Sequence, residues 1–412
     1  MSTPTEINEM ILGAGGVEEI LDIVERLSEG FSCVNAATAV FHITNNITVR
    51  GEQLLPDRRF KELLGMCVGY LREKGTVDAI CLTQFALALA RLRIDDSEMT
   101  EMIAQEAINR IDDFSSRQCA SLMRDMVKLK ACPPTLITAL QSSFLANINE
   151  TTLADVTNVF FASADLRNQN ASFLEPVTDR LGVLLDEACS QQEKGEGKSI
   201  MFFTPVTWSS LARSLSILRG VLSRQRVKGL FHRMEQLAIP NLGDFHRYES
   251  SLSLFLFYTS AIYDPESRPR LYIAAKPIIT SLAQDGKLEP IQLNQIATSY
   301  GHVGRNAVDQ PLITMLARAA LRRMSDFSAD DMARFTASMG RLLSCLKRQK
   351  KEVERAAVKP IVQELFTEMA VELKRSPQKL RAASQKNVNT IASAFGRVGV
   401  KSGLLLEAVS RR

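Results

Sequence analysis

Basic residues recur at fixed positions beside regularly spaced apolar residues. Leu92, Leu129 and Leu166 lie 37 residues apart, and each ends an apolar run. Apolar residues equivalent to these three leucines recur along the chain. The residue directly before such a position is Arg91, Lys128, His302, Arg341 or Arg397, and the residue directly after is Arg93, Lys130, Arg167 or Arg219. A row of cations spaced by one repeat can follow a phosphate backbone, because each contact releases counterions.

The elements that must position these cations are pairs of helices. A fixed period of about 20–50 residues is typical of stacked repeats, whose units bury their cores against their neighbours. Each unit reads as an apolar first helix with small residues, a short polar or proline-containing turn, and an amphipathic second helix. The sequence therefore predicts an all-α fold, a right-handed α-solenoid of about nine ~37-residue helix-turn-helix repeats, in which the cations form a basic column.

The first helices can be placed individually. Phe-Ser pairs in Asp112–Gln118 and Ser325–Asp331, and a weaker copy in Gly30–Asn35, mark helix starts, because serine caps the free N–H groups of a first turn. Pro133 and Pro134 open a second helix, where proline costs little. We expect first helices near residues 31–46, 77–92, 114–129, 151–166, 207–218, 248–262, 290–303, 327–342 and 384–398.

Three of these first helices share a glycine. The segments Ile296–Gly304, Phe335–Leu342 and Ile391–Gly399 each place a glycine between a bulky residue and a basic one. Glycine within a helix costs roughly 1 kcal/mol relative to alanine. We therefore expect these glycines to have a packing role, which would be the close approach of a neighbouring helix.

A second basic cluster follows the column near the C-terminus. It comprises Lys347, Arg348, Lys350, Lys351 and Arg355, and we place it at the start of an extended basic helix over residues 347–381. In most proteins such a cluster is a solvated helical face, but beside the column a contact with RNA or with an acidic protein is an equal alternative. For the column, the alternative is that each cation stabilises its own helix, because a cation near a helix C-terminus interacts favourably with the helix dipole by about 0.3–1 kcal/mol.

Charge divides the chain unevenly, although the net charge is only +4. Residues 1–30 carry seven acidic residues against Arg26, and we expect this segment to cap the stack or to dock a basic partner. Repeats follow over residues 31–187, then a polar insertion over residues 188–206, then repeats with a basic end over residues 207–412. A basic end on a neutral body suits an anionic partner, above all nucleic acid.

Several kinds of chemistry are excluded by the sequence. Gly195–Ser199 resembles the end of a phosphate-binding loop, but Gln192 occupies the position where such a loop requires its first glycine. The four histidines are not paired with Cys or Asp at metal-ligand spacing, and no catalytic motif is present. We therefore expect no enzyme, no metal, no cofactor and no small-molecule substrate.

Other features limit the compartment and the mode of binding. No apolar run approaches the ~18 residues needed to span a bilayer, so we expect no membrane among the partners of this chain. The seven cysteines suggest buried free thiols in a reducing compartment. Aromatic residues are 6% of the chain, and the only tryptophan, Trp208, is expected in the core, so RNA contact would be made through the backbone.

The repeats resemble a known class. Ile103–Leu129, Lys128–Leu140 and Leu316–Leu342 resemble octotricopeptide and heptatricopeptide repeats. Such repeats occur in organellar RNA-binding proteins related to the FAST-kinase-like and RAP-domain families, although no RAP domain is recognisable in this chain. The resemblance implies a role in mitochondrial RNA processing, editing or ribosome assembly, within a ribonucleoprotein complex that holds other protein subunits.

Two hypotheses follow. The first is a non-catalytic helical-repeat protein that binds RNA, and the second is a protein–protein scaffold of the HEAT or armadillo type without RNA contact. The mitochondrial location rests on the resemblance, because the acidic N-terminus lacks an Arg-rich presequence. Either a presequence was removed or the protein is not imported, and the alternative location is the cytoplasm.

Overall fold

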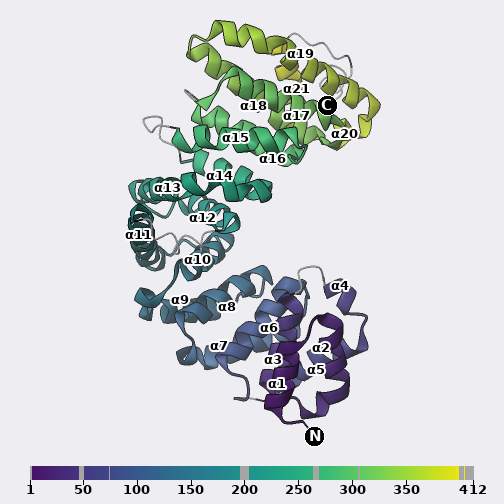
Figure 1. The fold of residues 1–412 in the computed structure, drawn as a ribbon, viewed down its shortest axis with the longest axis vertical. Helices are drawn as coiled ribbons and strands as arrows, with labels where there is room; N and C mark the ends of the chain where they lie inside the picture. Colours follow the sequence, from purple (N-terminus) through teal and green to yellow (C-terminus); the bar gives the residue numbers. More distant parts are fainter. Residues whose placement is uncertain are drawn as a thin grey trace. The chain divides into compact units, whose positions relative to one another are not determined.

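A computed structural model describes residues 2–45, 51–73, 75–194, 204–262, 269–304, 307–398 and 403. The described residues form α-helices joined by turns and short 3-10 segments, and they contain no β-strand. The chain divides into two compact units, residues 1–184 and residues 185–412, and each is considered by itself (Figure 1).

Among its described residues, the first unit contains ten complete helices and the beginning of an eleventh. They are α1 (Pro4–Gly13), α2 (Val17–Leu27), α3 (Cys33–Asn45), α4 (Gly51–Leu54), α5 (Arg58–Arg72), α6 (Ala79–Leu92), α7 (Ser97–Asn109), α8 (Ser116–Lys128), α9 (Pro134–Ala146), α10 (Leu153–Asp165) and α11 (Ala171–Glu193).

The second unit begins within α11 and continues to the C-terminus. Its further helices are α12 (Pro205–Leu218), α13 (Arg224–Ala238), α14 (Glu249–Ser260), α15 (Arg270–Gln284), α16 (Pro290–Val303), α17 (Gln310–Arg322), α18 (Ala329–Arg348), α19 (Glu352–Arg375), α20 (Pro377–Ala382) and α21 (Gln385–Val398).

Each unit is a stack of helix pairs in two layers. In the first unit α1, α3, α6, α8 and α10 pack in succession, and α2, α5, α7 and α9 form the second layer. In the second unit α12, α14, α16, α18 and α21 pack in succession, while α15, α17 and α19 pack beside them. All nine expected first helices are present, as α3, α6, α8, α10, α12, α14, α16, α18 and α21. The predicted all-α stack of helix pairs is therefore confirmed.

The expected helix starts also hold. Ser115 and Ser328 accept hydrogen bonds from backbone N–H groups of α8 and α18, and each forms a reciprocal capping box with the residue three positions on. Ser32 accepts from the N–H of Asn35 at 3.3 Å, so the weaker copy caps α3 in the same way. Pro134 is the first residue of α9.

The expected packing role of the shared glycine is right at one position and wrong at two. A Cβ at Gly301 of α16 would lie 3.3 Å from the Cβ of Arg341 on α18, so glycine lets these helices approach closely. A Cβ at Gly340 or Gly396 would have no neighbour within 4 Å among the described residues. The side of the helix that carries these two glycines faces open space, so neighbour contact does not explain them.

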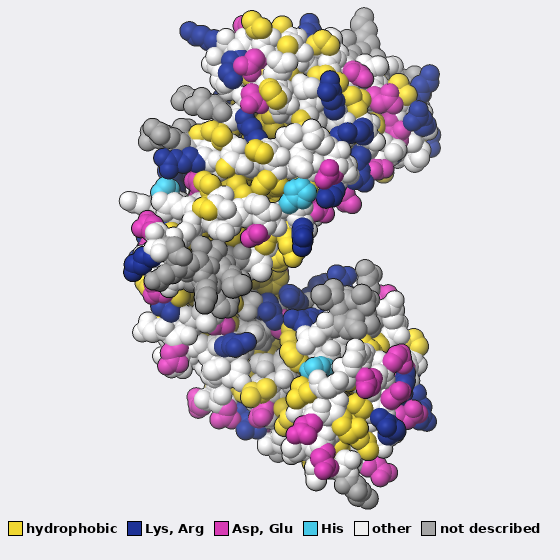
Figure 2. All heavy atoms as spheres, viewed as in Figure 1, with side chains coloured by type: hydrophobic (Ala, Val, Ile, Leu, Met, Phe, Trp, Pro, Cys, Tyr) yellow, Lys and Arg dark blue, Asp and Glu magenta, His cyan; other side chains and the backbone are white. Residues whose placement is uncertain are grey.

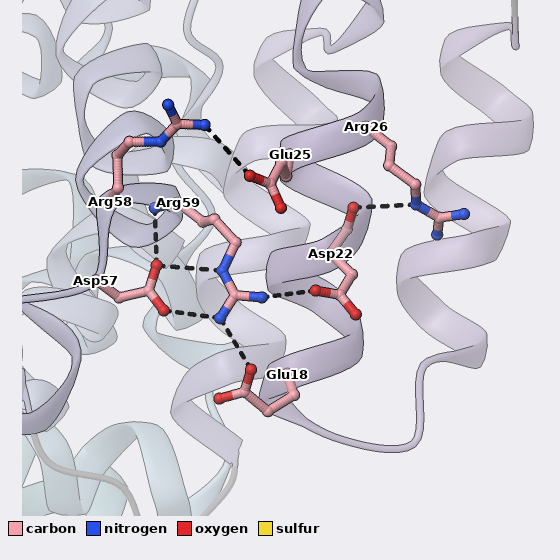
Figure 3. A network of polar contacts seen from close by, with 7 residues as sticks. All are labelled: Glu18, Asp22, Glu25, Arg26, Asp57, Arg58 and Arg59. Atoms are coloured by element: carbon pink, nitrogen blue, oxygen red, sulfur yellow. Dashed lines mark hydrogen bonds and ion pairs between the residues drawn. The ribbon is translucent and has the colours of Figure 1, made fainter.

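The acidic N-terminal segment is part of the stack. Its two helices pack on the first repeat, α1 on α3 and α2 on α5. Arg59 of α5 binds Glu18 at 2.8 Å, Asp22 at 2.6 Å and Asp57 at 2.7 Å (Figure 3). Glu18 and Asp22 therefore hold α2 on α5.

Two expected boundaries differ in the structure. The insertion predicted over residues 188–206 is shorter at both ends, because α11 continues to Glu193 and α12 begins at Pro205. The phosphate-loop-like Gly195–Ser199 lies outside the described residues. The basic cluster that begins at Lys347 does not start one long helix over residues 347–381. Instead α18 runs on to Arg348, and α19 begins only at Glu352.

Candidate nucleic-acid interface

A groove of about 1310 Å³ lies in the second unit, between α18, α19 and α21. Most of its charged lining residues are basic, and they come from all three helices: Arg341, Lys347, Arg355, Lys359, Lys386 and Arg397. Glu352 is the one acidic residue among the described residues that line it. Positive charge therefore surrounds the groove on each side.

Small side chains line much of the remaining surface. α18 contributes Thr336, Ala337, Gly340 and Ser344, α19 contributes Ala356, and α21 contributes Asn389, Thr390, Ser393 and Ala394. Phe366 also lines the groove, and its ring packs against that of Phe395, with ring centroids 5.3 Å apart. Phe366 is buried, so no exposed aromatic ring of the described lining is available to stack on a base.

Most of the groove cations are free to bind an anion. Arg355 pairs with Glu352 at 3.2 Å. Lys347, Lys359, Lys386 and Arg397 form no ion pair with any residue in the described part of the chain, and all four are exposed. In Figure 2 Lys and Arg side chains lie among Asp and Glu side chains over the C-terminal helices and also over the N-terminal ones. An anion that binds in the groove would lower the mutual repulsion of these cations.

Equivalent positions of successive first helices do line up in the second unit. Arg341 Nη1 of α18 lies 3.0 Å from His302 Nε2 of α16. Arg341 and Arg397 of α21 both line the groove. Burial, and then the charge of Arg341, lower the pKa of His302, which favours a neutral imidazole. The predicted column thus leads from His302 into the groove.

The first unit shows the same alignment with different partners. Arg91 of α6 donates to Asn45 of α3 at 2.9 Å. Lys128 of α8 lies 5.6 Å from the ring centroid of Phe161 on α10 and 3.8 Å from Asp125. Burial lowers the pKa of Lys128, and the nearby charges of Arg124 and Arg91 lower it further. Much of the binding capacity of Lys128 is therefore used within the protein.

Four predicted cations share an unusual backbone conformation. Arg93, Lys130, Arg167 and Lys350 have φ values of 57°, 58°, 50° and 58°, which lie in the left-handed region. Each closes the C-terminus of a first helix, with the next N–H bonded back into the last turn, as Ala131 N donates to Met126 O at 3.0 Å. This conformation costs a side-chain-bearing residue roughly 1–2 kcal/mol.

The remaining predicted residues contact the protein itself. Arg219 donates to the carbonyl of Ala261 at 3.1 Å, at the end of α14. Arg348 donates to Cys345 Sγ at 3.3 Å, and Lys351 pairs with Glu354 at 3.1 Å. Of the cluster after residue 346, only Lys347 and Arg355 line the groove. Arg348 is the last residue of α18, and Lys350 and Lys351 lie in the turn before α19.

Two of the groove cations, Lys359 and Lys386, were not predicted from the sequence. Lys359 follows Arg355 by four residues, so both lie on one face of α19. That spacing is a signal the sequence does contain. Lys386 lies in the first turn of α21, whereas the column was traced only at the C-terminal ends of first helices. No periodic signal pointed to Lys386.

The described residues contain no group of three or more His, Cys, Asp or Glu side chains arranged to hold a metal ion. Within the same residues, no helix combines the length and the apolar character that crossing a membrane requires. All seven cysteines are free thiols, and five of them are buried.

Comparison with known proteins gives little. No family model and no curated protein matches the chain. Among solved structures, the chain is similar to a homology model of the full-length AP-3 complex in an intermediate open conformation. The identity is 10%, the TM-score is 0.25, and the match covers 96% of this chain and 77% of that chain. At this TM-score the likeness supports neither a fold nor a function.

Proposed function

We propose that this chain is a non-catalytic helical-repeat protein that binds RNA through the groove between α18, α19 and α21. The observation that carries the proposal is that, among the described residues, six Lys and Arg side chains and one Glu line this groove together with small residues. Such a surface fits a phosphate backbone, which brings charge at every nucleotide. With no exposed aromatic ring in the described lining, binding would not depend on base identity.

The resemblance of Ile103–Leu129 and Leu316–Leu342 to octotricopeptide and heptatricopeptide repeats supports a narrower form of the proposal. In that form the RNA belongs to a mitochondrial ribonucleoprotein complex, where the chain acts in RNA processing, editing or ribosome assembly beside other protein subunits.

The test is RNA binding over a salt series. Anisotropy of a labelled mixed-sequence single-stranded RNA would be measured from about 50 mM to about 300 mM salt. The groove variant is Lys347→Gln/Lys359→Gln/Lys386→Gln. Its matched control, Lys61→Gln/Arg318→Gln/Lys374→Gln, removes the same charge from exposed positions that do not line the groove.

We expect the affinity of the unchanged protein to fall steeply with salt. Because each phosphate contact on a single strand contributes about 0.7 to the slope of log K against log salt, the groove variant should lose about 2 from that slope. The control should lose little. Equal losses in both variants would refute the groove, and no RNA affinity at low salt would refute RNA binding and favour a protein scaffold.

A further inference from the structure

The first unit has a row of cations of its own. It runs along the C-terminal ends of three successive first helices, α6, α8 and α10. Arg93, Lys130 and Arg167 follow these helices at intervals of 37 residues, and all three are exposed. Each has its backbone in the left-handed region. We refer to these three residues as the cap row.

The helix closure itself does not require a cation. After α15 the same closure is made by Gly286, with φ of 69°, and Lys287 N donates to Leu282 O at 3.0 Å. Glycine adopts this conformation without strain, whereas an arginine or lysine does not. The long basic side chains of the cap row therefore sit where the fold alone would favour glycine.

The helix dipole does not account for Arg93 or Lys130 either, although α10 has no basic residue in its last turn and Arg167 is the first cation after it. Arg91 and Lys128 already place a cation in the last turn of α6 and α8, in ordinary helical conformation. Arg93, Lys130 and Arg167 form no hydrogen bond or ion pair through their side chains with any residue that the structure describes. Their charge is thus left for a partner outside the chain.

We propose that the cap row is a second RNA-backbone contact, separate from the groove and located in the first unit. Neighbouring packed helices lie about 8–10 Å apart, so consecutive cations of the row can reach successive stretches of one extended strand. Together with Arg91 and Lys128 they put five cations at the ends of α6, α8 and α10. Of the acidic residues near these ends, Asp125 is buried and contacts Arg124 and Lys128, and Asp96 caps α7, which leaves Asp95 and Asp165 exposed. The exposed cations therefore outnumber the exposed acidic residues, and this edge fits a polyanion. The inference rests on the proposed function, because it names a further surface for the same RNA.

The test exploits the backbone conformation. Arg93→Gly/Lys130→Gly/Arg167→Gly removes three charges and relieves strain at once, so the folded protein should be at least as stable as the original in thermal unfolding. Binding of the same single-stranded RNA should weaken, and the salt slope should fall by about 2. Lys61→Gln/Arg318→Gln/Lys374→Gln again controls for the loss of net charge. If the glycine variant folds poorly, Arg93→Gln/Lys130→Gln/Arg167→Gln removes the same three charges and keeps the Cβ atoms. Its RNA affinity and salt slope should fall in the same way.

The outcomes separate the two proposals. Unchanged affinity and slope in the glycine and glutamine variants, with a clear loss in the groove variant, would overturn the cap row and leave RNA binding intact. No RNA affinity in the unchanged protein would instead overturn the proposed function. Weaker binding in the cap-row variants but not in the control would support the second contact.

Discussion

Arg341 of α18 and His302 of α16 occupy equivalent positions of neighbouring repeats, and Arg341 Nη1 lies 3.0 Å from His302 Nε2. Because the guanidinium can only donate, Nε2 of the imidazole must accept and therefore carries no proton. Gly301, next to His302, makes this approach possible, since a side chain there would press on the Cβ of Arg341. The residues that the repeat aligns thus form a direct contact.

This contact predicts a pH dependence of stability. The pKa of His302 is lowered by burial and by Arg341, so below about pH 6.5 the unfolded chain takes up this proton more readily than the folded one. The contribution of His302 is therefore fully present above that pH and is lost as the pH falls toward the lowered folded pKa. Urea unfolding of His302→Gln should show a weaker loss of stability between about pH 7 and pH 5 than the original chain. His232→Gln, which changes an exposed histidine of α13, is the control, and an identical pH profile for both variants would contradict the prediction.

The Arg59 network predicts a local effect on the N-terminal helices. Arg59 binds three carboxylates, and its side chain is 19% exposed (Figure 3). Arg59→Ala should lower the free energy of unfolding by roughly 1–2 kcal/mol and should speed hydrogen exchange in α2. Arg58→Ala is a matched control, because Arg58 pairs only with Glu25 among the described residues, at 3.2 Å and with 81% of its side chain exposed. A pair of this kind contributes about 0–1 kcal/mol. Equal effects of the two variants would show that the network does not hold α2.

Acid should weaken the same network. The hydrogen bonds and the ion pair between Asp57 and Arg59 hold the pKa of Asp57 at about 2, against an ordinary value of 3.8. The stability that Asp57 contributes is therefore present above about pH 4 and is lost as the pH falls from there toward about 2. Asp57→Asn should remove this part of the acid sensitivity, which circular dichroism during acid titration would detect. An unaltered acid transition in Asp57→Asn would contradict the role of Asp57.

Trp208 gives a probe of the second unit alone. It is the only tryptophan in the chain, it is 1% exposed, and its ring lies 6.0 Å from that of Phe255. Its fluorescence should be shielded from acrylamide in the native protein and should become accessible only when the second unit unfolds. If the two units unfold separately, the fluorescence transition and the circular dichroism transition will not coincide. Strong quenching of the native protein would show that Trp208 is not in the core.

Much of the fold follows from local signals in the sequence. The 37-residue spacing of Leu92, Leu129 and Leu166 marks the ends of successive first helices, and a fixed period of this kind indicates stacked repeats. Ser115 and Ser328 cap their helices through hydrogen bonds within three residues, so their role can be predicted without the rest of the structure. Both kinds of prediction were confirmed.

The groove could not be predicted in the same way. Its cations come from three helices, and Lys386 is more than 30 residues from Lys347 along the chain without any shared period. The sequence also could not tell Gly301 from Gly340, because the two have the same local pattern. Only the packing of α18 on α16 and the open space over Gly340 separate them.

Gly340 provides a test of the groove that leaves its charge unchanged. It lines the groove, and a Cβ at this position would have no neighbour within 4 Å in the part of the chain that the structure describes. Gly340→Leu should therefore fold and gain up to about 1 kcal/mol in helix propensity, while its side chain fills space that the RNA would need. Gly396→Leu is the matched control, since Gly396 is the equivalent glycine of α21, is equally open, and does not line the groove.

We expect Gly340→Leu to weaken RNA binding without changing the slope of log K against log salt, because no cation is removed. Gly396→Leu should bind as the original chain does. This combination would show that the RNA occupies the groove itself and is not held only by diffuse positive charge over the C-terminal helices. Equal affinity of the two leucine variants would place the RNA elsewhere, even if the lysine variants of the groove had weakened binding.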